Sequence, residues 1–184
     1  MGAGDVAFDA DGNLWTTNDN AIVRFDASQL TASTDAAPSA TIIARDAADT
    51  MDLAASALAF DADGDLWAVD FGGNLAFELL QEELGGGGAQ TLVSNVSIAI
   101  AVAALLDRPA FDDGGGLWLG LGGAGIGRLA PAQLMSSSGA GDPTMLDTVI
   151  TSPDLGSSGR VAFFPAAVGL PLYHSLPAPG IVRP

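Results

Sequence analysis

The sequence predicts an all-β repeat fold, and three observations carry this prediction. A nearly constant nine-residue stretch occurs three times, as AFDADGNLW at 7–15, AFDADGDLW at 59–67 and AFDDGGGLW at 110–118. Between these stretches, short alternating apolar segments are separated by turn-forming Asp, Asn and Gly residues. No repeat contains a convincing amphipathic helix. A fixed period of this kind indicates a chain built from stacked copies of one unit.

Aromatic residues mark a period of about 51 residues. Phe8, Phe60, Phe111 and Phe163 are separated by 52, 51 and 52 residues, and the tryptophans keep the same step. Aromatic side chains at the same phase of each unit are expected to pack neighbouring units against each other. The predicted structural anchors are Phe8, Trp15, Phe60, Trp67, Phe111, Trp118 and Phe163.

One unit, followed from its start, predicts four short strands. In the first unit these are DVAF (5–8), NLWTT (13–17), AIVRF (21–25) and ATIIA (40–44). Asp-rich and Asn-rich turns separate the first three, and DASQL (26–30) is expected to form one helical turn before the fourth. Threonine-led triplets mark the expected last strand of three units: TII (41–43), TLV (91–93) and TML (144–146). Four antiparallel strands in a unit of this length describe a blade of a β-propeller.

The predicted organisation is a single propeller domain or propeller fragment over residues 1–184, with four repeats and an incomplete last blade. The expected blades span about 5–47, 57–97, 108–150 and 160–184. The fourth repeat, VAFFPAAVGLPLYHS, lacks both turn aspartates and the tryptophan of the others. Three arrangements stay open: a small or partial propeller, a piece of a larger one, and a half that pairs with another copy.

The pattern FDADGNLW…IVRFD, with GDLWAVD at 64–70, resembles the NHL-type, SMP-30 (gluconolactonase)-like and streptogramin-lyase-like propellers. The resemblance implies a blade type and leaves the activity open, because propellers with similar blades differ in chemistry. In SMP-30-like lactonases, a divalent cation lies at the central mouth on Asp, Asn and Glu oxygens. The resemblance therefore implies Asn18, Asp70 and Asp107 as metal-ligand candidates. For Asp70, a turn-stabilising role is the favoured alternative.

The acidic turns DADGN (9–13) and DADGD (61–65) begin like an EF-hand calcium loop. The glutamate that completes such a loop is missing, because the twelfth positions are Asn20 and Gly72. A hairpin turn in which Asp binds its own backbone is the favoured alternative. A divalent cation, calcium, is the candidate cofactor, and the sequence establishes none.

His174 is the single histidine and the one candidate for a general base. It lies among prolines in the degenerate repeat, where a surface or packing role is the favoured alternative. Neither a nucleophile elbow, a phosphate loop nor a zinc-protease motif is present. The catalytic residues are therefore unknown at this point.

The formal net charge of −16, with no lysine, disfavours nucleic acid and anionic membranes as partners. The longest apolar run, VSIAIAVAALL at 96–106, is too short to cross a bilayer, so no membrane insertion is expected. Absence of cysteine leaves the redox compartment undetermined. We expect a soluble protein of undetermined location; secretion or a periplasmic location fits a processed N-terminus.

Two classes of function follow from these observations. The favoured one is a non-enzymatic binding or interaction module that uses the propeller face or an exposed blade edge, with an unknown ligand. The expected partners are another copy of the chain or missing blades that complete the ring. The alternative is a divalent-metal-dependent hydrolase or lyase of the lactonase-like type, acting at the central mouth.

Overall fold

Strands dominate the computed structural model, which describes residues 4–33, 35–70, 72–102, 106–122, 125–152, 155 and 161. The helical elements formed by described residues are the short 3-10 turns η1 (Ala27–Leu30), η2 (Gln81–Glu83) and η3 (Pro131–Met135). None of the described helices is long and apolar enough to cross a membrane. The prediction of an all-β chain is confirmed, and the helical turn expected from DASQL is present as η1.

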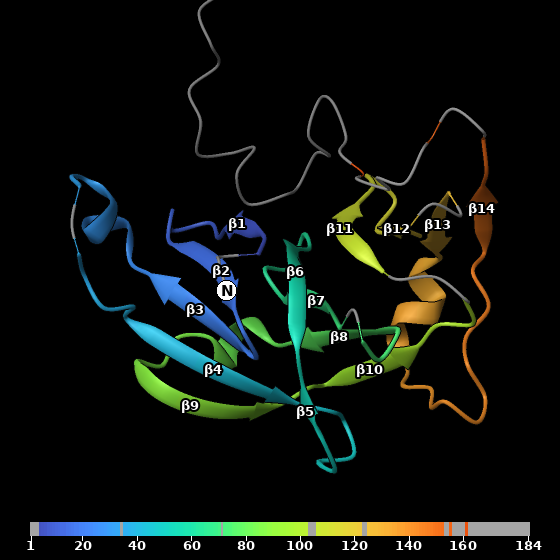
Figure 1. Cartoon of the computed structure of the whole chain (residues 1–184), viewed down its shortest axis with the longest axis horizontal. Coiled ribbons are helices and arrows are strands. Elements are labelled where there is room, and N and C mark those ends of the chain that lie inside the picture. Colours follow the sequence, from blue (N-terminus) through green and yellow to red (C-terminus); the bar gives the residue numbers. More distant parts are fainter. Residues whose placement is uncertain are drawn as a thin grey trace, which may run out of the picture.

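The strands form three sheets, which Figure 1 shows one after another from left to right. The first contains β1 (Val6–Phe8), β2 (Leu14–Asn18), β3 (Ala21–Phe25), β4 (Ala40–Arg45) and β5 (Asp52–Leu53), with β9 (Gly88–Val93) added beside β4. The second contains β6 (Ala55–Phe60), β7 (Leu66–Asp70), β8 (Leu75–Leu79) and β10 (Val96–Ala99). The third contains β11 (Asp107–Phe111), β12 (Leu117–Gly120), β13 (Ile126–Leu129) and β14 (Thr148–Ile150). Neighbouring strands are antiparallel except for β4 and β9.

The expected last strands of the second and third units differ from the observed ones. The TLV triplet lies in β9, which pairs in parallel with β4 of the first sheet from Ala40↔Gly88 to Arg45↔Val93. The second sheet is closed instead by β10, and the third by β14, which begins after the TML triplet. The apolar pattern identifies a strand but not its partner, and β9 satisfies the outer backbone groups of β4.

A similar contact joins the second and third units. Ile98 and Ile100, at the outer edge of the second sheet, form parallel bridges with Ser138 and Thr144. The Thr144 amide donates to the Ala99 carbonyl at 2.7 Å. In both places, the connection that follows the third strand of one unit covers the outer strand of the unit before it. No described residue pairs with the outer edge of β14 in this way.

Buried side chains fill the two spaces between the sheets. Trp15 of the first unit packs edge-to-face on Phe60 of the second, with ring centroids 6.0 Å apart. Trp67 packs on Phe111 of the third unit in the same way, at 6.1 Å. Trp15 and Trp67 therefore each join their unit to the next one. Of the other three predicted anchors, Phe8 and Trp118 are only partly buried, and Phe163 lies outside the described residues.

Candidate functional site

The aspartate of each repeated stretch is a hydrogen-bond acceptor for its own turn. Its Oδ1 accepts the backbone N–H groups two and four residues later, and its Oδ2 accepts the indole N–H of the tryptophan six residues later. The Oδ2–Nε1 distances are 2.8 Å for Asp9 and Trp15, 3.1 Å for Asp61 and Trp67, and 2.8 Å for Asp112 and Trp118. This turn accounts for the recurring aspartate and tryptophan of the nine-residue stretch.

A glycine completes each of these turns. Gly12, Gly64 and Gly115 have φ values of 81°, 89° and 76°, in the left-handed region that glycine adopts without steric cost. The aspartate thus fixes both the turn and the orientation of the tryptophan that packs on the next unit.

A cavity of about 350 Å³ lies between the second and third units. Trp67, Phe111, Pro131 and Leu134 contribute apolar parts of its lining. Its acidic lining includes Asp61, Asp65 and Glu78, whose carboxylates have oxygens within 4.8 Å of one another. Among the described residues, this is the one group of three acidic, histidine or cysteine side chains close enough to share an ion.

The protein environment makes ionisation of this cluster unfavourable. Burial, together with the charges of Asp65, Asp61 and Asp63, raises the pKa of Glu78, although the Asn95 amide donates to its Oε2 at 2.6 Å. Burial and the Asp65 charge likewise raise the pKa of Asp61, against the hydrogen bonds that its carboxylate accepts. Glu78 is only 9% exposed, so solvent screens its repulsion by the neighbouring carboxylates weakly.

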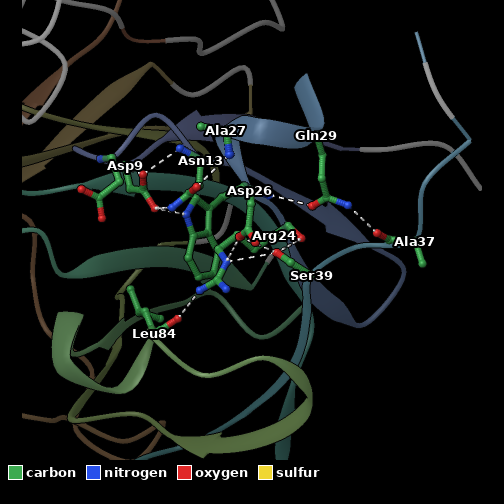
Figure 2. A network of polar contacts seen from close by, with 11 residues as sticks. Asp9, Asn13, Arg24, Asp26, Ala27, Gln29, Ala37, Ser39 and Leu84 are labelled. Atoms are coloured by element: carbon green, nitrogen blue, oxygen red, sulfur yellow. Dashed lines mark hydrogen bonds and ion pairs between the residues drawn. The ribbon is translucent and has the colours of Figure 1, made fainter. Parts of the chain in front are cut away.

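Arginine stands at the position of Glu78 in the other two units. The residues paired with the tryptophans across the hairpin are Arg24, Glu78 and Arg128. Figure 2 shows Arg24 reaching from β3 toward Leu84, with Asp26 and Ser39 beside it. The guanidinium of Arg24 lies 5.6 Å from the centroid of Trp15 and donates to the Leu84 carbonyl at 2.7 Å.

Arg128 holds the turn of the third unit. Its Nε donates to Asp112 Oδ2 at 2.7 Å, and its Nη1 donates to Asp147 at 3.2 Å. Burial acts to raise the pKa of Asp112, but the hydrogen bonds from Arg128, the Gly116 amide and Trp118, with the charge of Arg128, lower this pKa to about 2. Equivalent aspartates of the second and third units therefore have opposite pKa shifts.

We expect Glu78→Gln to stabilise the fold at pH 7. Because the pKa of Glu78 is raised, its ionised carboxylate destabilises the folded state at pH values above that pKa. This destabilisation is lost as pH falls through the raised pKa. The amide removes this cost, and Tm should rise by about 2–4 °C at pH 7. Below about pH 4, where the carboxyl is protonated, the two proteins should unfold at the same temperature.

Calorimetry at pH 7 and at low pH measures this effect, with Glu83→Gln as the control. Glu83 is exposed in η2, so its replacement should leave Tm unchanged. A lower Tm for Glu78→Gln at pH 7 would contradict the proposed repulsion.

The metal-ligand candidates expected at the central mouth lie apart from this cluster. Asp70 is buried and accepts backbone N–H groups of Ala54, Gly72 and Gly73, as in the turn-stabilising alternative. Asn18 is exposed at the end of β2. Asp107 accepts the amide of Arg108 at 2.9 Å. Neither Asp70 nor Asp107 belongs to a group of acidic side chains close enough to share an ion within the described residues.

His174, the candidate general base, lies outside the described residues. Asp5 is buried and forms contacts with both later units: its Oδ2 accepts the Leu58 amide at 3.2 Å, and its Oδ1 lies 3.4 Å from Arg108 Nη1. The cluster around Glu78 was not identified from the sequence. The signal for it is the glutamate at the position where the other two units have Arg24 and Arg128.

Comparison with solved structures finds a similar fold in β-propeller proteins. The extracellular domain of a hybrid two component system from B. thetaiotaomicron matches with a TM-score of 0.56 and 17% identity, over 72% of this chain and 17% of that one. A protein described as a gluconolactonase matches with a TM-score of 0.52 and 16% identity, over 88% of this chain and 51% of that one. Streptogramin B lyase gives a TM-score of 0.49 and 19% identity, over 71% of this chain and 38% of that one.

These identities establish a likeness of fold alone, and the fold is that of β-propeller repeats. The chain spans 17% to 51% of the length of the three proteins. No protein-family model matches the sequence, and the search of curated proteins finds no match.

Proposed function

We propose that this chain is a non-enzymatic binding module made of propeller repeats. It would comprise four units of about 51 residues, the last incomplete, and would associate with a further unit through the outer edge of β14. The further unit would belong to a second copy or to additional blades. The observation that carries this proposal is the difference in cover between β14 and the outer strands of the first two sheets.

The outer strands of the first two sheets, β4 and β10, are each covered by a segment of the next unit. Six residues of β4 pair with β9, and β10 is entirely buried beneath the connection that contains Ser138. In contrast, Val149 and Ile150 of β14 are 52% and 45% exposed. An apolar edge that no described residue pairs with is a template for strand addition, since its backbone groups and side chains would gain partners together.

Light scattering with amide exchange tests the association. We expect a mass at least twice the 18.4 kDa of one chain at micromolar concentration, with the amides of β14 protected. Val149→Lys should shift the mass to that of one chain. Met51→Lys is the matched control, because Met51 is 48% exposed in a loop away from this edge, and should leave the mass unchanged. A strict monomer whose β14 amides are nevertheless protected would contradict the proposal.

A metal-dependent hydrolase or lyase remains the second candidate, and the acidic cluster favours it. Asp61, Asp65 and Glu78 offer hard oxygen ligands of the kind that calcium prefers. The general base of such an enzyme would be His174. Calcium and zinc titrations followed by calorimetry, on the wild type, Asp70→Ala and Glu78→Gln, separate the possible sites.

Each outcome of this titration has a clear meaning. If the heat of ion binding is lost in Glu78→Gln but retained in Asp70→Ala, the ion binds in the cavity. Heat that is lost only in Asp70→Ala would favour the central mouth with Asn18 and Asp107. The enzyme candidate is dropped if the wild type binds neither ion.

A further inference from the structure

The cavity between the second and third units has a counterpart between the first and second. The counterpart, of about 280 Å³, is lined by Asp9, Asn13, Trp15 and Arg24 of one unit and by Phe60 and Leu84 of the next. The residues at the same phase in the larger cavity are Asp61, Asp65, Trp67, Glu78, Phe111 and Leu134. The two cavities are therefore versions of one inter-unit space, and they can be compared position by position.

In the first unit, a guanidinium of the protein itself lines this space. Arg24 lies over the Trp15 ring and reaches across to the Leu84 carbonyl of the next unit. In the third unit, the guanidinium of Arg128 is bound to the carboxylate of the turn, Asp112. The aspartate–tryptophan turn thus has an arginine side chain seated beside it in two of three units.

The second unit lacks this cation and adds two carboxylates. Glu78 replaces the arginine, and Asp65 stands where the other units have Asn13 and Gly116. None of the ion pairs among the described residues involves Asp61, Asp65 or Glu78. Asp61, Asp65, Glu78 and the Trp67 ring therefore form part of the lining of a cavity in which the equivalent guanidinium is missing.

We propose that this cavity binds a guanidinium group supplied from outside the chain, either the arginine side chain of a partner protein or a small guanidinium compound. Asp61, Asp65 and Glu78 would accept its N–H groups, and Trp67 with Leu134 would contact its plane and alkyl chain. A guanidinium suits this lining because it is planar, permanently charged and weakly hydrated, and because it stacks on aromatic rings. This inference is independent of the association through β14, and its failure leaves that proposal standing.

The test is an NMR titration that follows the indole N–H signals of the three tryptophans. The probes are the peptide Ac-Ala-Arg-Ala-NH2, its citrulline twin, which is neutral but similar in shape, and N-butylguanidinium. We expect the arginine peptide to shift the Trp67 signal saturably, because this N–H is bonded to Asp61, and to leave the Trp15 signal in place. The citrulline peptide should not saturate at tenfold higher concentration.

Two variants show whether the response comes from the cavity. Glu78→Arg should supply the missing guanidinium internally, as Arg24 does, and weaken peptide binding at least tenfold. Glu78→Gln, which keeps the shape of the side chain, should also weaken it. Glu83→Arg makes the same charge change on the exposed η2 turn and should bind like the wild type.

The different probes also distinguish a partner protein from a small guanidinium compound, and a guanidinium group from a metal ion. Tighter binding of the peptide than of N-butylguanidinium indicates a partner protein, and equal or weaker binding indicates a small compound; both support guanidinium recognition. Equal binding of the arginine and citrulline peptides, unchanged binding by Glu78→Arg, or no saturable shift would overturn the proposal. A Trp67 shift with calcium but not with the arginine peptide would also overturn it and would assign the cavity to a metal ion.

Discussion

Replacing Trp67 with alanine is expected to lower the free energy of unfolding by about 3–5 kcal/mol. The indole is 2% exposed and packs on Phe111 of the next unit. Its removal leaves a cavity between two sheets and takes away the donor that Asp61 Oδ2 accepts at 3.1 Å. Since domains are commonly stable by about 5–15 kcal/mol, this loss is a large share of the total.

Trp67→Phe separates packing from hydrogen bonding. It keeps an aromatic ring against Phe111 but lacks the N–H group, so we expect a smaller loss of about 1–2 kcal/mol. Urea denaturation followed by circular dichroism measures both variants. A loss below about 1 kcal/mol for Trp67→Ala would show that this side chain does not hold the units together.

Asp112→Asn is expected to destabilise the fold by about 2–3 kcal/mol at pH 7. The carboxylate of Asp112 accepts two backbone N–H groups, the Trp118 indole and the Arg128 guanidinium. An asparagine retains one oxygen acceptor, but its amide nitrogen must face groups that also donate. The charge that Arg128 needs beside it is lost at the same time.

The effect of Asp112→Asn should depend on pH in a defined direction. The pKa of Asp112 in the folded state is about 2, below the ordinary value of 3.8. Its carboxylate therefore stabilises the fold fully above the ordinary value, and this contribution is lost as pH falls toward 2. The difference between variant and wild type should shrink over this range.

Asp113→Asn provides the matched control for this measurement. Asp113 is the exposed neighbour in the same turn, and its replacement should change stability by less than about 0.5 kcal/mol. Equal effects of the two substitutions would contradict the role of Asp112 in the turn.

The sequence was informative about local structure because that structure repeats. The Asp, Gly and Trp of each nine-residue stretch are local in sequence, so their turn and strand could be predicted from spacing. The pairing of β9 with β4 could not, because an apolar strand fits either of two sheet edges and the choice depends on the assembled units.

The acidic cavity was harder to predict than the turns for a related reason. Asp61 and Asp65 lie in the predicted turn between β6 and β7. Glu78 lies on β8, and only the pairing of β8 with β7 brings it close to them. The resemblance to lactonases directed attention to the central mouth and therefore to Asp70. The carboxylate of Asp70 accepts the backbone N–H groups of Gly72 and Gly73, as in the turn-stabilising alternative.

Trp15 and Trp67 each join their unit to the phenylalanine of the next unit, and double-mutant cycles test this joint most directly. We predict coupling energies of about 0.5–1.5 kcal/mol for Trp67 with Phe111 and for Trp15 with Phe60. The mixed pair, Trp15 with Phe111, should couple by less than about 0.5 kcal/mol. Matched pairs that couple no more strongly than the mixed pair would contradict the account.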